Sequence, residues 1–147
     1  MNRVAINAAE VPVPRWTGEA YTFMLKVLDY IHRDNWDLSV LFCNDAYIRR
    51  LNAQYRNKDE PTDVLSFELG ETVEERYLPG DIVISLETLG ENAGYFKVSE
   101  DEELRRLLIH GILHLDGLDH ATNANSEPML ELQEKIMANL AGERILP

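Results

Sequence analysis

Apolar residues recur every three or four positions in four stretches of the chain, the spacing that places them on one face of an α-helix. These predicted helices cover residues 17–33, 44–55, 99–115 and 126–140. Residues 86–96 have weaker helical character, because Gly90 and Gly94 interrupt the pattern. Continuous or alternating apolar runs predict four short strands, at residues 4–7, 38–43, 63–69 and 81–85. We expect the acidic stretch between the last two strands to be a loop.

These elements predict an α+β or α/β fold, with a layer of about four strands and more helices than strands. A chain of 147 residues is long enough for one domain that buries about two-thirds of its unfolded surface. We therefore expect residues 1–147 to form a single domain, while the order of its strands stays open. In the second helix, Ile48, Leu51 and Tyr55 share the face that is expected to point inward.

The helix predicted over residues 99–115 is the central one, since it is mostly apolar from residue 107 to residue 115. Ser99 and Glu102 form a capping box, in which the serine hydroxyl accepts a hydrogen bond from a free N–H group of the first turn. Gly117 marks the end of this helix, because glycine readily adopts the left-handed conformation found at helix C-termini.

The composition is that of an ordinary folded domain, with 45% hydrophobic and 27% charged residues. No apolar run approaches the roughly 18 residues of a membrane span, and Glu10, Pro12 and Pro14 interrupt any signal-peptide core. The single cysteine, Cys43, lies in an apolar run and is expected to be buried. Because there is no disulfide framework, we expect a cytoplasmic protein without membrane association.

The formal net charge of −12 weighs against binding of nucleic acid by bulk attraction. Locally the balance is different, because four basic residues fall within ten positions: Arg49, Arg50, Arg56 and Lys58. Arginine suits phosphate recognition because its planar guanidinium donates paired hydrogen bonds, although any one of these residues could equally be a solvated charge. The acidic clusters at residues 71–75 and 100–103 are expected to be solvated surface.

Three of the four histidines lie within eleven residues, at His110, His114 and His120. Positions four apart share one face of a helix, so the first two can bind one ion, and the turn at Gly117 lets the third return to it. A single histidine on an apolar helix is usually a core residue, but this pair lies off the main apolar stripe. Three nitrogen ligands leave one coordination position open, which is typical of a catalytic metal site.

The histidine run matches the zinc-hydrolase pattern His-Glu-x-x-His-x-x-Gly-x-x-His except that Gly111 replaces the glutamate. That glutamate is the general base of metalloproteases, so its absence weighs against peptide hydrolysis. Asp116 or Asp119 would have to supply the carboxylate instead. A metal can still lower the pKa of a bound water to about 7, which would allow hydrolysis of an ester without a carboxylate at this position.

Residues 51–67, residues 80–85 and the histidine run together resemble the YbeY family of bacterial metal-dependent endoribonucleases, which act in ribosomal RNA maturation. The resemblance spans about residues 44–120, more than half of the chain. It implies a helix-rich α+β fold around a small mixed sheet, one divalent metal ion bound by the three histidines, and a functional arginine at Arg56. The chain departs from the family at Leu118, where members commonly carry an aromatic or polar residue.

On this basis we predict a single-strand-specific endoribonuclease that matures ribosomal RNA, at the 3′ end of the small-subunit rRNA, and takes part in ribosome quality control. The three histidines are expected to hold Zn²⁺, with Ni²⁺ as the alternative, because imidazole suits several metals. Arg56 is expected to stabilise the charge that develops on the phosphodiester. Arg49, Arg50 and Lys58 are expected to bind the RNA in a basic rim beside the metal.

Asp63 and Ser66 are further candidates for supporting the site, although both could simply make structural hydrogen bonds at the start of a strand. Two other functions stay open. One is a metalloprotease-like hydrolase. The other is a non-enzymatic ribosome-assembly protein whose metal only orders the turn after Gly117, with a ribosomal protein or a ribosome-associated GTPase as its partner.

Overall fold

The computed structural model describes residues 1–147 and contains the predicted numbers of strands and helices. The elements are β1 Arg3–Ala8, α1 Thr17–Tyr30, β2 Asp37–Cys43, α2 Asp45–Arg56, β3 Val64–Val73, β4 Arg76–Ser85, α3 Leu86–Phe96, α4 Glu100–Leu115 and α5 Pro128–Asn139. Despite its two glycines, α3 is an uninterrupted helix, and the Ser85 hydroxyl caps it by accepting a hydrogen bond from the N–H of Thr88.

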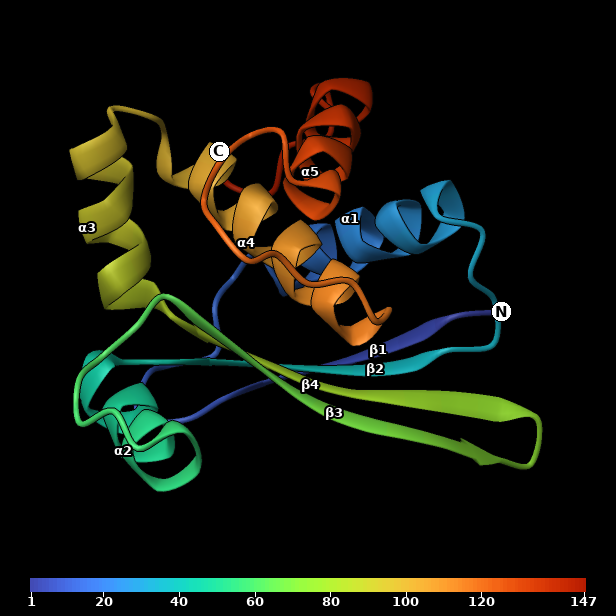
Figure 1. Cartoon of the computed structure of the whole chain (residues 1–147), viewed down its shortest axis with the longest axis horizontal. Helices are drawn as coiled ribbons and strands as arrows, with labels where there is room; N and C mark the ends of the chain where they lie inside the picture. The colour runs from blue at the N-terminus through green and yellow to red at the C-terminus, as the bar shows by residue number, and fades with distance from the viewer.

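The four strands form one mixed sheet in the order β1-β2-β4-β3. β1, β2 and β4 run parallel, and β3 pairs antiparallel with β4 at the edge of the sheet. Figure 1 shows α1, α4 and α5 on one side of the sheet and α2 on the other. This arrangement confirms the α+β fold with a small mixed sheet, and it supplies the strand order that the sequence pattern leaves open.

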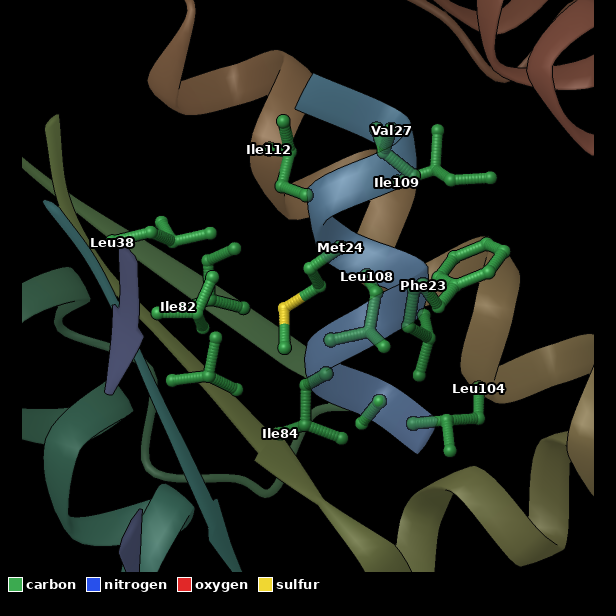
Figure 2. Packing of buried hydrophobic residues seen from close by; sticks show 14 of the residues in the cluster. Phe23, Met24, Val27, Leu38, Ile82, Ile84, Leu104, Leu108, Ile109 and Ile112 are labelled. Atoms are coloured by element: carbon green, nitrogen blue, oxygen red, sulfur yellow. The ribbon is translucent and has the colours of Figure 1, made fainter. Parts of the chain in front are cut away.

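The core lies between the sheet and helices α1 and α4, as Figure 2 shows. Leu38, Ile82 and Ile84 of the sheet are fully or almost fully buried there, together with Met24 of α1 and Leu108 of α4. Of the 16 residues of α4, 11 are buried, which confirms the prediction of a central helix covered on more than one side. None of the helices has the length and apolar character needed to cross a membrane.

At Gly111, α4 lies directly on β4. A Cβ atom placed on this glycine would be 2.9 Å from both Cγ2 and Cδ1 of Ile82. Carbon atoms in favourable contact are about 3.5–4.0 Å apart, so even a methyl group is too large here. The close approach holds the middle of α4 against the sheet and so sets how far His110 and His114, which lie on the same helix, stand from the sheet.

The acidic stretch between the third and fourth strands is not the loop that the sequence predicts. β3 continues to Val73 and β4 begins at Arg76, so the two strands form a ribbon with a turn at Glu74 and Glu75. Both turn residues have positive φ, at 48° and 70°, as in hairpin turns that match the twist of the strands. Because the β3 side chains from residue 68 onward are exposed on both faces, no apolar alternation marks this part of the strand in the sequence.

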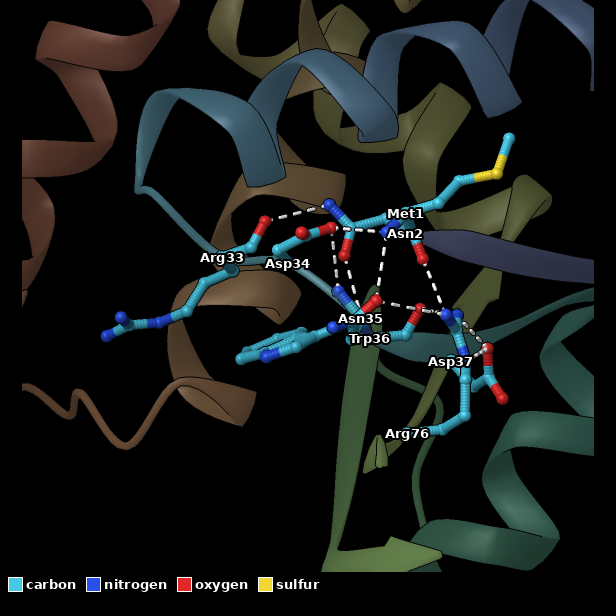
Figure 3. A network of polar contacts seen from close by, with 8 residues as sticks. All are labelled: Met1, Asn2, Arg33, Asp34, Asn35, Trp36, Asp37 and Arg76. Atoms are coloured by element: carbon cyan, nitrogen blue, oxygen red, sulfur yellow. Dashed lines mark hydrogen bonds and ion pairs between the residues drawn. The ribbon is translucent and has the colours of Figure 1, made fainter. Parts of the chain in front are cut away.

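A polar network ties the turn end of this ribbon to the start of β2 (Figure 3). The Arg76 guanidinium donates to the Asp37 carboxylate and to the backbone oxygens of Met1, at 2.7 Å, and Trp36, at 3.0 Å. The N–H of Tyr77 donates to the carbonyl oxygen of Asn35 at 2.8 Å. These bonds fix the ribbon to the body of the protein.

Of two predictions about side-chain burial, the one for Cys43 is confirmed and the one for Tyr55 of α2 is wrong. Cys43 is fully buried, as expected. Tyr55 was expected to point inward, but it is 55% exposed, and its ring lies edge-on to Phe67 with 5.3 Å between centroids. Only Ile48 and Asn52 of this helix are buried, because α2 covers the outer face of the sheet as a single helix without a second layer.

The acidic residues 100–103 are not uniformly solvated, which corrects the expectation from the sequence. Asp101 is 2% exposed and accepts hydrogen bonds from the backbone N–H groups of Ile145 and Leu146, at 2.7 and 2.8 Å, and from Arg105 at 2.9 Å. Burial by itself would raise the pKa of Asp101, but the two backbone bonds and the arginine outweigh it and hold the pKa below its usual value. Glu103 is also buried, at 4% exposed.

Candidate metal centre

The turn after α4 is built as the sequence predicts. Gly117 has a φ of +94°, which favours glycine. Its N–H donates to the carbonyl oxygen of His114, and the N–H of Leu118 donates to that of Leu113, both at 3.0 Å. This pair of bonds is the Schellman motif, which reverses the chain at a helix C-terminus. The reversal brings His120 back towards the last two turns of the helix.

The three histidines lie together at this turn. The ring centroid of His110 is 4.7 Å from that of His114 and 5.2 Å from that of His120, and the latter two are 5.7 Å apart. One ring nitrogen of each lies within 4.8 Å of the others, and all three side chains are half-buried. Because a zinc ion lies about 2.0–2.1 Å from each nitrogen ligand, a small closure of this triangle would bring all three to one ion.

Hydrogen bonds orient two of the rings for this role. His110 Nδ1 lies 2.7 Å from Oε1 of Gln133, and His120 Nδ1 lies 2.8 Å from the carbonyl oxygen of Thr122. Both partners are acceptors, so Nδ1 of each ring carries the proton and Nε2 keeps its lone pair free. Metal-binding histidines are generally held in this way by a second hydrogen bond.

The same surroundings keep two of the rings neutral. Burial lowers the pKa of His110; the hydrogen bond to Gln133 opposes this effect, and the charge of His114 adds to it. Burial also lowers the pKa of His114, against the opposing charge of Asp119. Since a metal binds only the neutral imidazole, these shifts favour the ligand form, and the donor set fits one divalent metal ion.

Arg56 opens into the same hollow as His110 and His114. This hollow has a volume of about 530 Å³ and is lined by Arg56, Val64, Leu65, Ser66, Glu68, His110, His114 and Asp119. One N–H of the guanidinium donates to the backbone oxygen of Ser66 at 2.8 Å, and the guanidinium lies 5.3 Å from the centre of the Phe67 ring. Its remaining donors have no partner within the chain, so they are available to an anionic ligand.

The other predicted basic residues do not line this hollow. Both nitrogens of a guanidinium edge of Arg49 donate to Asp59, at 2.8 and 3.2 Å. Arg50 lies 3.8 Å from a carboxylate oxygen of Glu10. Lys58 is exposed and makes no ion pair. The structure therefore brings Arg56 to the histidines and leaves the other three outside the hollow.

The two supporting candidates lie at the start of β3. Ser66 lines the hollow and contributes its backbone oxygen to Arg56. The Asp63 carboxylate accepts from the N–H of Val64 at 2.7 Å and from the Asn92 amide at 3.1 Å, which are structural contacts.

Sequence reasoning missed Gln133, which orients His110 from the middle of α5. Glutamine at this position carries no motif, and its distance of 23 residues from the histidine gives no periodic signal. Only the packing of α5 against α4 brings the two side chains together.

Three histidines at the end of a helix that packs on a mixed sheet, beside an arginine-lined hollow, define a site of the metal-dependent hydrolase class. The sequence profile of the family described as endoribonuclease YbeY matches residues 5–141. The chain belongs to this family.

Individual relatives agree with the family match. The chain is 48% identical over 143 residues to the endoribonuclease YbeY of Treponema pallidum, an alignment that covers 94% of this chain and 89% of the relative. It is 52% identical over 120 residues to the protein of the same name from Treponema denticola, covering 78% and 77%. A solution structure of a protein from Thermotoga maritima superimposes with a TM-score of 0.67 at 31% identity, covering 97% of this chain and 91% of the other.

Proposed function

We propose that this protein is a metal-dependent endoribonuclease that cleaves single-stranded RNA in ribosomal RNA maturation, at the 3′ end of the small-subunit rRNA, and in ribosome quality control. One observation carries the proposal. In a member of an endoribonuclease family, His110 and His114 of the three-histidine centre and an unpaired arginine edge open into a single hollow large enough for a nucleotide.

The residues have separate roles in this proposal. His110, His114 and His120 hold the metal through the nitrogens that face one another. A bound divalent metal, taken as zinc with nickel as the alternative, would supply Lewis acidity and lower the pKa of a coordinated water. Arg56 donates its free N–H groups to the non-bridging oxygens of the phosphodiester and stabilises the charge that develops there. The Ser66 carbonyl and the Phe67 ring hold the guanidinium in place.

A protease mechanism is not favoured by the surroundings of the metal centre. Gly111 takes the place of the protease glutamate and points at Ile82 in the core, so no carboxylate fits there. Asp116, one of the two substitutes considered, is held by Arg33 at 2.6 and 3.1 Å. Asp119 lines the hollow, with a carboxylate oxygen 3.9 Å from Nδ1 of His114, so it is the one of the two substitutes that remains near the metal centre.

RNA binding in so acidic a protein must be local. Lys58 is the basic residue most available for it, since Arg49 and Arg50 are each placed next to a carboxylate. All three stay proposed RNA contacts, with rRNA as the substrate in the cytoplasm. A ribosomal protein or a ribosome-associated GTPase is the proposed protein partner.

The test is cleavage by the purified metal-loaded protein. It should cut single-stranded RNA and leave unstructured casein intact under the same conditions. His120→Ala should lose most of the bound metal and the cleavage, whereas His32→Ala, which alters an exposed histidine far from the centre in sequence, should lose neither. Chelator-sensitive casein cleavage without RNA cleavage would refute the proposal, and so would full RNA cleavage by a metal-free His120→Ala protein.

A further inference from the structure

A second hollow opens on the histidine centre beside the one that contains Arg56. It has a volume of about 550 Å³ and is lined by residues of α3, α4, α5, the segment that follows α4 and the start of β3. Figure 1 shows where these elements lie. His110 and Val64 line both hollows, so the metal centre stands between them. The second hollow continues into an adjoining one of about 380 Å³, with Phe96, Glu103 and Asn123 lining both.

Glu103 is the unexplained group in this hollow. Its residue is only 4% exposed, yet its carboxyl group makes no hydrogen bond or ion pair within the chain. Every fully buried side-chain oxygen in the protein has a hydrogen-bond partner. The Glu103 oxygens have none, so they keep some exposed surface, and this surface faces the hollow that the residue lines. Burial raises the pKa of Glu103, and the charge of Asp63 raises it further, against Arg106. A ligand that donates hydrogen bonds to this carboxylate would offset the cost of burying it.

The acidic groups of the second hollow disfavour a phosphate in the part that lies away from the metal centre. Asp63 and Glu103 line it, and the basic residue Arg106 is already held by Glu102 and Glu134, with N–O distances of 3.0 Å to each. The positive group that suits a phosphate lies in the first hollow, at Arg56. The second hollow is therefore suited to an uncharged group that carries N–H donors.

The second hollow also offers a ligand an aromatic ring and a free side-chain amide. Phe96, at the end of α3, is 60% exposed and lines the hollow, with apolar Leu130 of α5 also in the lining. Proteins commonly hold the bases of single-stranded RNA by stacking them on such exposed rings. Asn123 is exposed, and its side-chain amide makes no hydrogen bond within the chain, so it can donate to a carbonyl oxygen of a ligand.

We propose that this second hollow is a guanine subsite, which binds the base of a nucleotide next to the phosphodiester that lies at the metal centre. The ionised Glu103 carboxylate accepts two parallel hydrogen bonds, and the edge of guanine offers two adjacent donors, N1–H and the N2 amino group. Guanine O6 then faces the Asn123 amide, and the ring stacks on Phe96. Adenine and cytosine place an acceptor beside their amino group, and uracil flanks its single N–H with carbonyls, so each would meet the carboxylate with a repulsive atom.

This inference rests on the proposed endoribonuclease function, and cleavage mapping tests both. The substrates are oligouridine strands that contain one guanosine, and matched strands with inosine or 7-deazaguanosine in its place. Cleavage should concentrate at one fixed position relative to the guanosine. Inosine, which lacks the N2 amino group, should reduce this preference, whereas 7-deazaguanosine, which keeps the donor edge, should not.

Two variants and two controls assign the effect to the hollow. Glu103→Gln keeps the shape of the side chain but cannot accept both bonds, so it should lower the guanosine preference about tenfold while the protein keeps its metal. Phe96→Ala should weaken cleavage at the guanosine site. Glu100→Gln, on the helix of Glu103, and Glu91→Gln, on the helix of Phe96, each remove an exposed acid that lines neither hollow, so both should behave as wild type.

A binding measurement separates this inference from the proposed function. GMP, AMP and UMP contain no internal phosphodiester, and NMR titration of the metal-loaded protein should show tighter binding of GMP, lost in Glu103→Gln. A protein that prefers GMP but cleaves no RNA would refute the nuclease and leave the subsite standing. Equal binding of the three nucleotides, or an unchanged guanosine preference in Glu103→Gln, would overturn the subsite even if RNA is cleaved.

Discussion

Replacement of Gly111 by alanine should destabilise the protein, although alanine is the better helix former. In a helix interior, glycine to alanine ordinarily gains about 1 kcal/mol. Here the new Cβ would lie 2.9 Å from Cγ2 and Cδ1 of Ile82 and 3.0 Å from its Cγ1, which is about 0.5 Å or more inside a favourable contact. Because Ile82 is fully buried, neither it nor the helix can move freely. Overpacking of this kind costs about 1–3 kcal/mol, so after the helix gain is subtracted we expect a net loss of up to about 2 kcal/mol.

A double-mutant cycle tests whether the contact with Ile82 causes this loss of stability. Ile82→Ala removes all three of the atoms that would clash and should by itself cost about 2–5 kcal/mol, because it leaves a cavity. In that background, Gly111→Ala meets empty space, partly fills the cavity and recovers the helix preference. It should then stabilise the protein by up to about 1 kcal/mol. The helix gain is common to both backgrounds, so the coupling between the two substitutions equals the overpacking cost of about 1–3 kcal/mol.

Urea unfolding followed by circular dichroism measures the four free energies of unfolding, and equal slopes of the four transitions check that the unfolded states are comparable. If Gly111→Ala changes stability by the same amount with isoleucine and with alanine at position 82, the close contact does not explain the glycine. The same contact accounts for the missing glutamate of the protease pattern, since a carboxylate here would be buried against isoleucine without a partner.

Three further predictions follow from individual contacts. Asp101→Asn should destabilise the protein by about 1–3 kcal/mol at neutral pH in urea unfolding. Because the folded-state pKa of Asp101 is lowered, the difference in stability from wild type should shrink as the pH falls below about 4. A difference that stays constant with pH would contradict this account. Gln133→Ala should weaken metal binding about 10- to 100-fold in a chelator competition, since His110 loses its orienting acceptor; unchanged affinity would mean that the bond is not needed. Lys58→Ala should flatten the slope of log RNA affinity against log salt concentration by about 0.7 if the lysine meets one phosphate, whereas Arg56→Ala should lower the cleavage rate with the fold intact. An RNA affinity that does not depend on salt would show that the basic residues do not bind RNA.

Local signals in the sequence were sufficient to predict those features that depend on a single helix or turn. The capping serine of α4 and the turn glycine after it are found where they were predicted, because caps depend on the backbone of a few neighbouring residues. The proximity of the three histidines follows in the same way, since two share a helix face and the third lies three residues past the turn. The resemblance of residues 44–120 to one family extended this local information to a fold and an arginine.

Other features were decided only by packing between elements that are distant in the chain. The ribbon of β3 and β4 was missed because its side chains are exposed on both faces, and pairing of the two backbones needs no apolar pattern. Tyr55 lies on a regular helix face that has no second layer above it, so its periodicity predicted a burial that α2 does not provide.

The sequence by itself thus determined the number and type of the elements, the two ends of α4 and the three metal-binding candidates, because hydrophobic period, caps and short spacings act over a few residues. The tertiary structure alone decided the strand order, the burial of Glu103 and the support of His110 by Gln133. It also paired Arg49 with Asp59 and left Arg56 facing the histidines. These outcomes depend on which surfaces meet across the fold, and a contact between residues far apart in the chain leaves no periodic mark in either segment.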